Sequence, residues 1–365
     1  MLLKKLLATV FCACIAFCCL GCDNEPKYSA GHLTTAESIS SREWQKRERT
    51  ELPGYFKVNV QAKINEAKKL YEANKKDKDI FVFFSDYHIE ENQGFSPLLI
   101  KEINKALPIS MVVFGGDIYD KGPTKDECLE KIKAFRQRFS FCEDKWQEVL
   151  GNHEYNTAQN NKKEHPEAFM DNELLKEKLL GKQLTAFAHS EYGDYWLDKG
   201  DMRYFFLGAT FNQKILPGQY TWLFEELTKV PDGKTVLLFS HIGCGHGPLL
   251  GKVDKPFAPV TQALGALKAG KNFTWQGVTY NYAGKKVTVA GCLTGHVHRD
   301  NLIEDNGITV AAICTDTLRY VPEKKMNRKP GTLSEQVIDI VVIDKAQHEV
   351  QMVRVGHGKN RSFKY

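Results

Sequence analysis

The sequence lacks the usual marks of nucleic-acid-binding and membrane-spanning proteins. Its 50 Lys and Arg residues exceed its 45 Asp and Glu residues by only five, and it has no long basic run, so no nucleic-acid partner is expected. The apolar run over residues 6–20 is too short to span a bilayer comfortably. No internal repeat is present. With 365 residues, 42% of them hydrophobic, the chain has the composition of a globular protein with a substantial core.

Cysteine is scarce beyond the N-terminal region. Five of the ten cysteines fall within the first 22 residues. The other five form an odd set without CxxC spacing: Cys128, Cys142, Cys244, Cys292 and Cys314. A bridge between Cys128 and Cys142 is conceivable in an oxidising compartment, but the pattern favours scattered buried thiols.

The first 21 residues have the layout of a secretory signal, with Lys4 and Lys5 before the apolar run. Residues 19–22, Cys-Leu-Gly-Cys, resemble the bacterial lipoprotein cleavage site, although Cys19 stands where that pattern has Leu. The resemblance implies a lipid on Cys22 and an exported protein anchored to a membrane of the cell envelope. Ordinary secretion and a retained anchor are the alternatives. Residues 22–57 are polar and predict a tether.

Apolar runs of strand type alternate with amphipathic helices in the first half of the chain. The pattern predicts helices over 59–75, 97–107 and around 129–139, and strands over 80–84, 111–114 and 147–150. This alternation indicates parallel strands whose carboxyl ends line one edge of a sheet, where open α/β sheets bind their ligands.

The second half is richer in strands. It predicts a hairpin over 195–207 and further strands over 236–239, 287–290, 308–313, 337–343 and 349–355. The Gly-rich stretch 244–285 is expected to be loop with little regular structure, over or beside the site. The residues after 356 are expected to form a polar tail with Arg361 at the surface. Together the elements predict an α/β fold, a sandwich of two sheets flanked by helices.

Five short polar clusters follow apolar runs and contain two Asp, one Asn and five His. In order they are Asp86-Tyr87-His88, Gly116-Asp117, Gly151-Asn152-His153-Glu154, Ser240-His241 and Gly295-His296-Val297-His298. Imidazole nitrogens and carboxylate oxygens suit divalent transition metals, and two ions about 3.5–4 Å apart can clamp both oxygens of a phosphoryl displacement. Asp117, after two glycines, meets the need for a bridging carboxylate on a tight turn.

The order of these clusters resembles the calcineurin-like metallophosphoesterase family, whose pattern is D-x-H, G-D, G-N-H-[DE], H and G-H-x-H. All five elements occur in order over residues 86–298. The resemblance implies a four-layer α-β-β-α sandwich of two mixed sheets, with a single catalytic domain over residues 58–365. It also implies hydrolysis of a phosphate ester, either a diester or a monoester, by a hydroxide that bridges two divalent ions (Mn, Fe or Zn).

The resemblance assigns roles to particular residues. The first metal would be held by Asp86, His88 and His298, with Asp117 bridging to the second metal. The second would be held by Asn152, His241 and His296. His153 would contact the substrate and act as the acid, with Glu154 as its partner.

Other residues near the motifs are weaker candidates for substrate contact or support. Residues 116–122 look like the G-D-x-x-D-R-G of the protein serine/threonine phosphatases, but Lys121 replaces Arg and loses its bidentate fork. Tyr119 could shape the pocket, and His246 could touch the substrate. Specificity is expected from 244–285, and no obligate protein partner is inferred. A nuclease of the same fold and a surface-binding lipoprotein with a structural metal site are the alternative functions.

Overall fold

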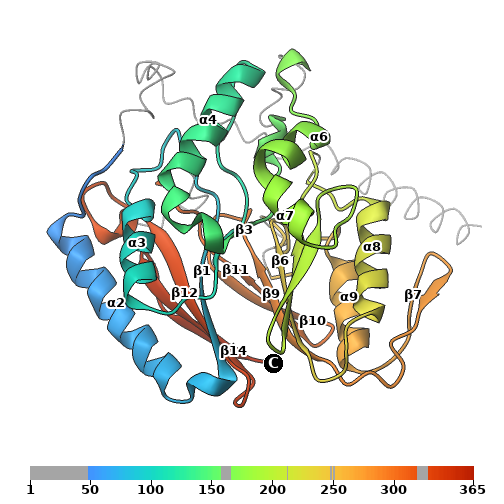
Figure 1. The fold of residues 1–365 in the computed structure, drawn as a ribbon. Helices are drawn as coiled ribbons and strands as arrows, with labels where there is room; N and C mark the ends of the chain where they lie inside the picture. Colours follow the sequence, from blue (N-terminus) through green and yellow to red (C-terminus); the bar gives the residue numbers. More distant parts are fainter. Residues whose placement is uncertain (1–47, 158–165, 212, 247–248, 250, 319–327) are drawn as a thin grey trace, which may run out of the picture. The chain divides into compact units, whose positions relative to one another are not determined.

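A computed structural model describes residues 48–157, 166–211, 213–246, 249, 251–318 and 328–365 (Figure 1). The expected signal over residues 1–21, the lipidation residue Cys22 and most of the expected tether lie outside these residues. Across the described ranges, no helix combines the length and apolar character needed to cross a membrane.

The first sheet has six strands in the order β14-β13-β12-β1-β2-β3. β1, β2 and β3 run parallel, whereas β12, β13 and β14 join by antiparallel pairing. The bounds are β1 Lys78–Phe84, β2 Val112–Phe114, β3 Trp146–Glu148, β12 Val337–Asp344, β13 Glu349–Gly356 and β14 Arg361–Lys364. The parallel strands predicted for the first half of the chain are therefore confirmed, with C-terminal strands added on one side.

The second sheet also has six strands, in the order β10-β11-β9-β6-β5-β4. The central strands β11, β9, β6 and β5 are parallel, and β10 and β4 are antiparallel edge strands. The bounds are β4 Tyr195–Lys199, β5 Met202–Leu207, β6 Thr235–Ser240, β9 Thr288–Thr294, β10 Asn301–Asp305 and β11 Ile308–Ala312. The hairpin and the mixed second sheet expected from the sequence are both present.

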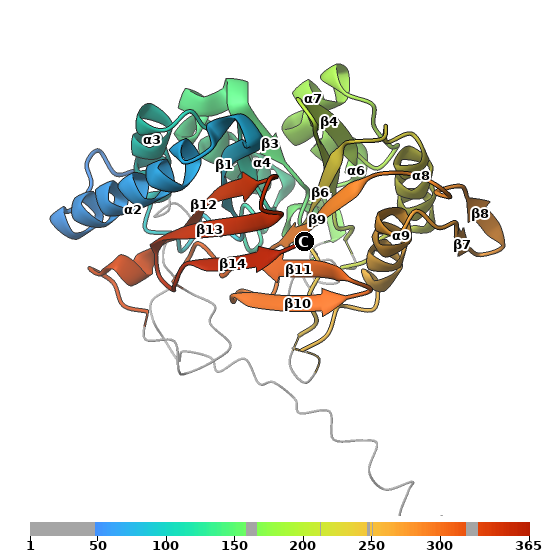
Figure 2. The same ribbon diagram turned by 90° about the horizontal axis from the view of Figure 1, so that it is seen from below.

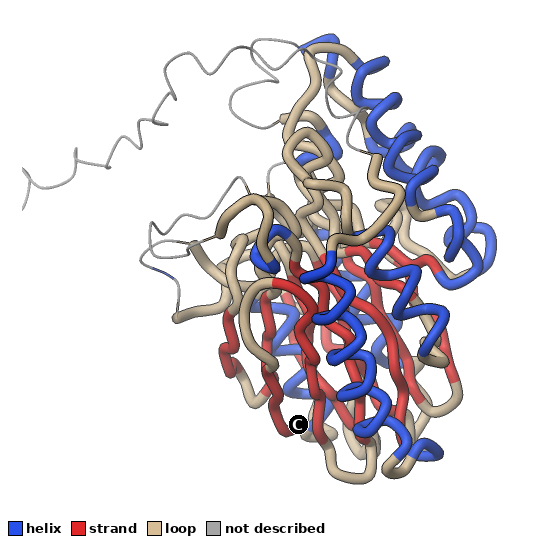
Figure 3. Tube along the Cα trace, turned by 90° about the vertical axis from the view of Figure 1, so that its left-hand side faces the viewer, coloured by secondary structure: helices blue, strands red, loops and turns tan. Residues whose placement is uncertain are grey.

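Helices cover the outer face of each sheet, so the fold is the expected α/β sandwich (Figures 2 and 3). α2, with α3 beside it, packs on the first sheet, and α9, with α8 beside it, packs on the second. The helix bounds are α2 Gly54–Glu72, α3 Ser96–Ala106, α4 Lys125–Arg138, α6 Asn172–Leu175, α7 Gly181–Ala186, α8 Pro217–Thr228 and α9 Ala258–Lys268. α2 begins at Gly54, inside the expected tether, because Phe56 is already buried in the core.

Alternating side chains in the strands hold the layers together. In β6, Leu237 and Phe239 join the core between the sheets, while Val236 and Leu238 join the core beneath α8 and α9. The Phe239 ring lies 5.6 Å from the ring of Phe81 in β1, so aromatic packing joins the two sheets. Strand alternation explains how one apolar run serves both layers.

The prediction of a loop over 244–285 is wrong. This stretch contains α9 and a small hairpin of β7 Phe273–Trp275 and β8 Val278–Tyr280. Val260, Leu264 and Leu267 are buried on one face of α9, so the stretch has the apolar spacing of a helix. The glycines in the stretch obscured this spacing in the sequence. Gly265 faces the loop at Asn306, where a Cβ would lie 2.5 Å from a backbone oxygen, so a glycine there allows close packing.

The prediction of a polar C-terminal tail is also wrong in part, because residues 361–364 form the strand β14. Arg361 is not a surface residue: its guanidinium lies 2.8 Å from Asp339 Oδ2 and donates to the carbonyl of Ala312. The five described cysteines are free and buried, which confirms scattered thiols and gives no Cys128–Cys142 bridge.

Candidate metal centre

The five polar clusters meet at one edge of the sandwich. Each follows the carboxyl end of a strand: the first three follow β1, β2 and β3 of one sheet, and the last two follow β6 and β9 of the other. Contacts across the edge join them, with His298 beside Asp86 and His241 beside Asp117. Residues 210 positions apart in the sequence thus share one site.

Five of the expected ligands adopt left-handed backbone conformations, which non-glycine residues rarely do. They are Asp86 (φ 56°), His88 (φ 40°), Asp117 (φ 65°), His296 (φ 68°) and His298 (φ 58°). Such conformations cost about 1–3 kcal/mol each and cluster at functional sites. Asp86 and His88 lie in the segment that follows β1, beyond the end of the strand.

Backbone contacts hold these turns against one another. The N–H groups of Asp86 and His88 donate to Gly116 O (2.9 Å) and Asp117 O (3.2 Å), which extends the pairing of β1 with β2. A Cβ on Gly151 would lie 2.6 Å from Asp117 N and would clash with the Asp117 carboxylate. The third cluster can therefore approach Asp117 this closely only with glycine at position 151.

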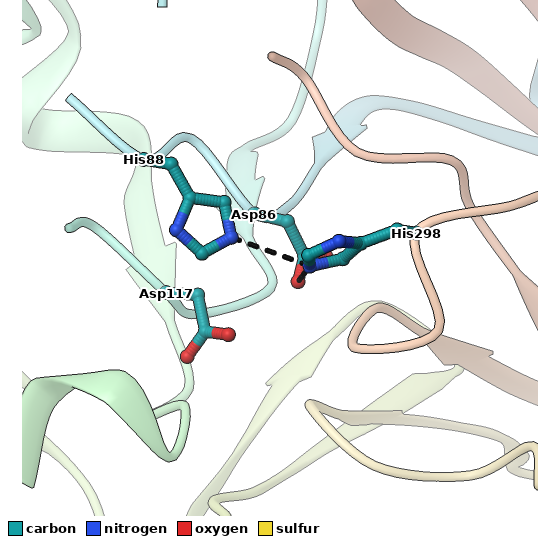
Figure 4. Close-up of side chains that lie close together, drawn as sticks. All are labelled: Asp86, His88, Asp117 and His298. Carbon is teal, nitrogen blue, oxygen red and sulfur yellow. Dashed lines mark hydrogen bonds and ion pairs between the residues drawn. The ribbon is translucent and has the colours of Figure 1, made fainter. Parts of the chain in front are cut away.

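The first group of ligand-type side chains has ligand atoms within 4.8 Å of one another: Asp86, His88, Asp117 and His298. Figure 4 shows His88 and His298 turned toward each other, with Nε2 atoms 3.3 Å apart. His298 Nε2 also lies 3.1 Å from Asp86 Oδ1. These are the residues that the family resemblance assigned to the first metal.

The second group contains Asp117, His241 and His296. His241 Nε2 lies 3.1 Å from both Asp117 Oδ2 and Asn152 Oδ1, so Asn152 belongs to the same cluster. His241 Nδ1 lies 2.7 Å from Gly115 O. Because a carbonyl can only accept, Nδ1 carries the hydrogen and Nε2 is the nitrogen that can bind a metal.

Within the described part of the chain, three buried atoms in these groups have no hydrogen-bond partner: His88 Nδ1, His296 Nε2 and Asp117 Oδ2. Buried polar atoms are nearly always satisfied, so unpartnered nitrogen and carboxylate oxygen atoms in one place fit a bound cation. The donor set of imidazoles, carboxylates and one amide therefore suits a divalent transition metal, and Asp117 is common to both groups.

The charge states of the groups agree with this donor set. Burial lowers the pKa of His88 to about 3 and also lowers that of His296, which keeps both rings in the neutral form that binds metals. Burial opposes ionisation of Asp86, but His298 outweighs it and the pKa is about 2. Burial likewise opposes the charged form of His241, but Asp117 raises its pKa to about 10. The Asp117 carboxylate therefore favours positive charge next to it.

His153 lies at the edge of both groups. Its Nε2 is 3.8 Å from Asp117 Oδ2, and its ring is 5.2 Å from that of His88. The other nitrogen, Nδ1, lies 2.6 Å from Asp120 O and 3.6 Å from Asp120 Oδ1. Asp120 is a supporting residue that the sequence did not single out, although it stands within the G-D-x-x-D segment.

Glu154 has contacts different from those expected of a partner for His153. Its carboxylate accepts backbone N–H groups from Gly151 (2.6 Å), Asp117 (3.1 Å) and Ile118 (2.5 Å), so it joins the turns after β2 and β3. Burial and the nearby Asp117 raise its pKa to about 7. Tyr119 is also buried, and its hydroxyl donates to Glu154 O at 2.6 Å. Both residues support the turns from behind the site.

Two further candidates lie on different sides of the site. The His246 ring is exposed and meets the His296 ring edge-on at 4.5 Å, so it stands beside the second group. The Lys121 side chain is exposed, and its carbonyl accepts from Lys131 at 2.6 Å. The structure therefore places His246 beside a side chain that would bind the second metal.

Comparison with solved structures shows the same fold. A dimetal phosphatase from Danio rerio is similar at 14% identity with a TM-score of 0.50, over 79% of this chain and 99% of that one. The purple acid phosphatase PPD1 from yellow lupin is similar at 12% identity with a TM-score of 0.48, over 79% of this chain and 54% of that one. No curated protein matches the sequence.

The calcineurin-like phosphoesterase family profile matches residues 80–300, which include all five clusters. The match spans more than half of the 365 residues. The chain therefore belongs to the calcineurin-like phosphoesterase family.

Proposed function

We propose that the protein hydrolyses phosphate esters at a centre of two divalent ions, bound by the two groups that share Asp117. The observation that carries this proposal is the meeting of the buried Asp117 carboxylate with buried ring nitrogens of His88 and His296 that have no hydrogen-bond partner among the described residues. Asp86, His88 and His298 would hold one ion, and His241, His296 and Asn152 the other. The mixed nitrogen and oxygen donors suit Mn, Fe or Zn better than Mg or Ca.

When bound, two such ions supply a hydroxide nucleophile at neutral pH and neutralise charge on the phosphoryl group. The chain's own part is to hold the ligands in fixed turns, since reorganisation during the reaction would raise the barrier. Glu154 contributes by joining the turn of Asp117 to that of Gly151. Positive charge at the site also attracts an anionic substrate.

His153 is the proton donor in this proposal. Its Nδ1 donates to Asp120 O, which directs Nε2 toward Asp117 and the centre. Burial lowers its pKa, but Asp117 and Asp120 outweigh burial and raise the pKa above the ordinary value. The protonated ring can then stabilise a phosphoryl oxygen or give its Nε2 proton to a leaving alkoxide. His246, beside His296, is placed to contact the rest of the substrate.

The same proposal includes export and a lipid on Cys22, on the pattern of residues 1–22. An exported enzyme acts on environmental or envelope phosphate esters, so small diesters and monoesters are the first substrates to test. Wild type should incorporate labelled palmitate and remain with membranes, and Cys22→Ser should do neither. Wild type without label would contradict the anchor while leaving the hydrolase proposal unchanged.

The central test compares an aryl phosphodiester with the matching aryl monoester, using protein loaded with Mn²⁺ or Zn²⁺. Turnover of either one, dependent on the metal, supports the proposal, and their ratio gives the diester or monoester preference. Bound metal without turnover of either ester would contradict an enzymatic role and favour a structural or binding role. Cleavage of DNA in place of both esters would favour a nuclease.

A further inference from the structure

Lys131 of α4 is a charged residue buried beside the site. Its side chain is 3% exposed, and an ammonium group is seldom buried unless its donors are satisfied. An ammonium has three N–H donors, and this one makes a hydrogen bond to a carbonyl and ion pairs with two carboxylates. The three partners are Lys121 O at 2.6 Å, Glu90 Oε1 at 2.9 Å and Glu127 Oε1 at 2.8 Å.

Two of these three contacts lead to Asp120. Lys131 holds the carbonyl of Lys121, the residue that follows Asp120. Glu90, held by Lys131 through one carboxylate oxygen, accepts the N–H of Asp120 with the other at 3.0 Å. The backbone is therefore held on both sides of Asp120. This is the residue whose carbonyl accepts from the ring of His153.

Asn156 fixes the next part of the same turn. Its side chain accepts from Gly122 N at 2.9 Å and donates to Gly122 O at 2.8 Å. The contact to His153 is thus made by a main-chain carbonyl, whose direction depends on the course of the turn. A displacement of about 1 Å in a catalytic group can cost about 100-fold in rate.

We propose that Lys131 is a positioning residue for His153, acting through Glu90 and the 120–122 turn. This inference rests on the role of His153 in the proposed function. It differs from a purely stabilising role, in which Lys131 would join α4 to the loop without affecting the ring. The two roles make different predictions for the coupling between Lys131 and His153.

Lys78 provides a matched control. Its side chain is also buried, at 6% exposure, and it contacts Asp344 Oδ2 (3.1 Å) and Leu70 O (2.5 Å). It lies at the start of β1, whereas the site lies beyond the end of that strand. Lys78→Met removes a comparable buried ammonium without touching the 120–122 turn.

The test is a double-mutant cycle on the full chain, with metal content measured for each variant. Lys131→Met should lower kcat about tenfold with KM and metal content little changed, and it should have less than about a twofold effect in a His153→Ala background. Lys78→Met should leave kcat unchanged in both backgrounds. Equal losses from Lys131→Met in both backgrounds, or no loss in either, would overturn the proposal.

A second measurement does not depend on turnover. In ¹⁵N spectra of the histidine rings, the His153 resonances, assigned by their absence in His153→Ala, should move in Lys131→Met and stay in place in Lys78→Met. Unmoved resonances in Lys131→Met would contradict the positioning role even if the protein were not a hydrolase. If Lys131→Met does not fold, Glu90→Gln weakens the same connection and should move the same resonances.

Discussion

Turns at both ends of the sheets need residues in left-handed backbone conformations, and the two ends differ in the residue types that they use. At the opposite end from the site, the β4–β5 and β10–β11 hairpin turns use glycine or asparagine in left-handed conformations, at Gly200, Asn306 and Gly307, and the β12–β13 turn uses His348. At the site end, five aspartates and histidines share this conformation with Gly116. Glycine and asparagine adopt this conformation at low cost, so their use in the hairpins follows from local preference. The site end keeps less favourable residues because their side chains are needed there.

The largest effect on turnover and metal content is expected from a substitution at the site end. Asp117→Asn should abolish measurable turnover and lower metal content, because Asp117 belongs to both groups of ligands. We expect an affinity loss of more than about 100-fold, above that of a typical outer-shell change. Asp201→Asn, in the β4–β5 turn at the other end, should change neither metal content nor rate, since the Asp201 carboxylate pairs with the partly exposed Lys345, away from the site. Full metal content in Asp117→Asn would contradict the assignment.

The next effect separates catalysis from metal binding within the site end. His153→Ala should keep both metals and lose about 100-fold to 10,000-fold in kcat, the usual contribution of a positioned acid. The expectation follows from the position of His153 Nε2, 3.8 Å from Asp117 Oδ2 and outside the closest contacts. Metal analysis and steady-state kinetics on one preparation would decide it. Loss of metal would make His153 a ligand and not an acid.

The two ends should also respond oppositely to pH. Asp316, near the site, is buried and accepts from Val337 N, and burial raises its pKa to about 7. In the unfolded chain the Asp316 carboxyl group loses its proton at a lower pH than in the folded protein. The free energy of unfolding therefore falls as pH rises from about 4 to 7, by up to about 4 kcal/mol. Asp344 is at the other end, where Gln347 N–H and Lys78 outweigh burial and lower its pKa. Its contribution is present above about pH 4 and is lost as pH falls further.

Denaturant unfolding at several pH values would test this contrast. Asp316→Asn should flatten the loss of stability between pH 4 and 7, and Asp344→Asn should flatten the loss below pH 4. Identical pH profiles for wild type and Asp316→Asn would show that Asp316 is ionised throughout this range.

The smallest effect concerns a turn away from both ends. Gln276 has φ 47° in the β7–β8 turn, before Gly277, and its side chain is exposed. Asn-Gly is the preferred pair for such a two-residue hairpin, so Gln276→Asn should stabilise the protein by about 0.5 kcal/mol without changing turnover. A thermal unfolding scan would detect the shift. A destabilised variant would mean that a contact of Gln276 stabilises the protein by more than its left-handed backbone conformation costs.

The sequence predicted the parts of the fold whose signals are local. Long apolar runs marked the central strands, and the family pattern predicted the ligand-type residues that the fold brings together. α9 was missed because Gly265 and its neighbours obscured the spacing of Val260 and Leu264. β10 was missed because only Ile303 of its five residues is buried, which leaves almost no apolar pattern.

The supporting residues of the site had no local signal. Asp120 holds His153 through a main-chain carbonyl, which any residue type could provide. Lys131 lies within an amphipathic helix, where lysine is normally solvated, and only the folded turn supplies acceptors for its ammonium group. Contacts of this kind depend on tertiary geometry, so sequence spacing cannot reveal them.

The position of β1 has a consequence for biosynthesis. β1 carries Asp86 and His88 at its end, and it pairs on one side with β2 and on the other with β12, Val337–Asp344. A nascent chain emerging from the ribosome therefore has β2 beside its first strand early, but it lacks the second neighbour until residues 337–344 have been made. Pairing over such sequence distances is slow, since loop closure must precede the contacts that stabilise it. Metal capture is thus expected to follow translation.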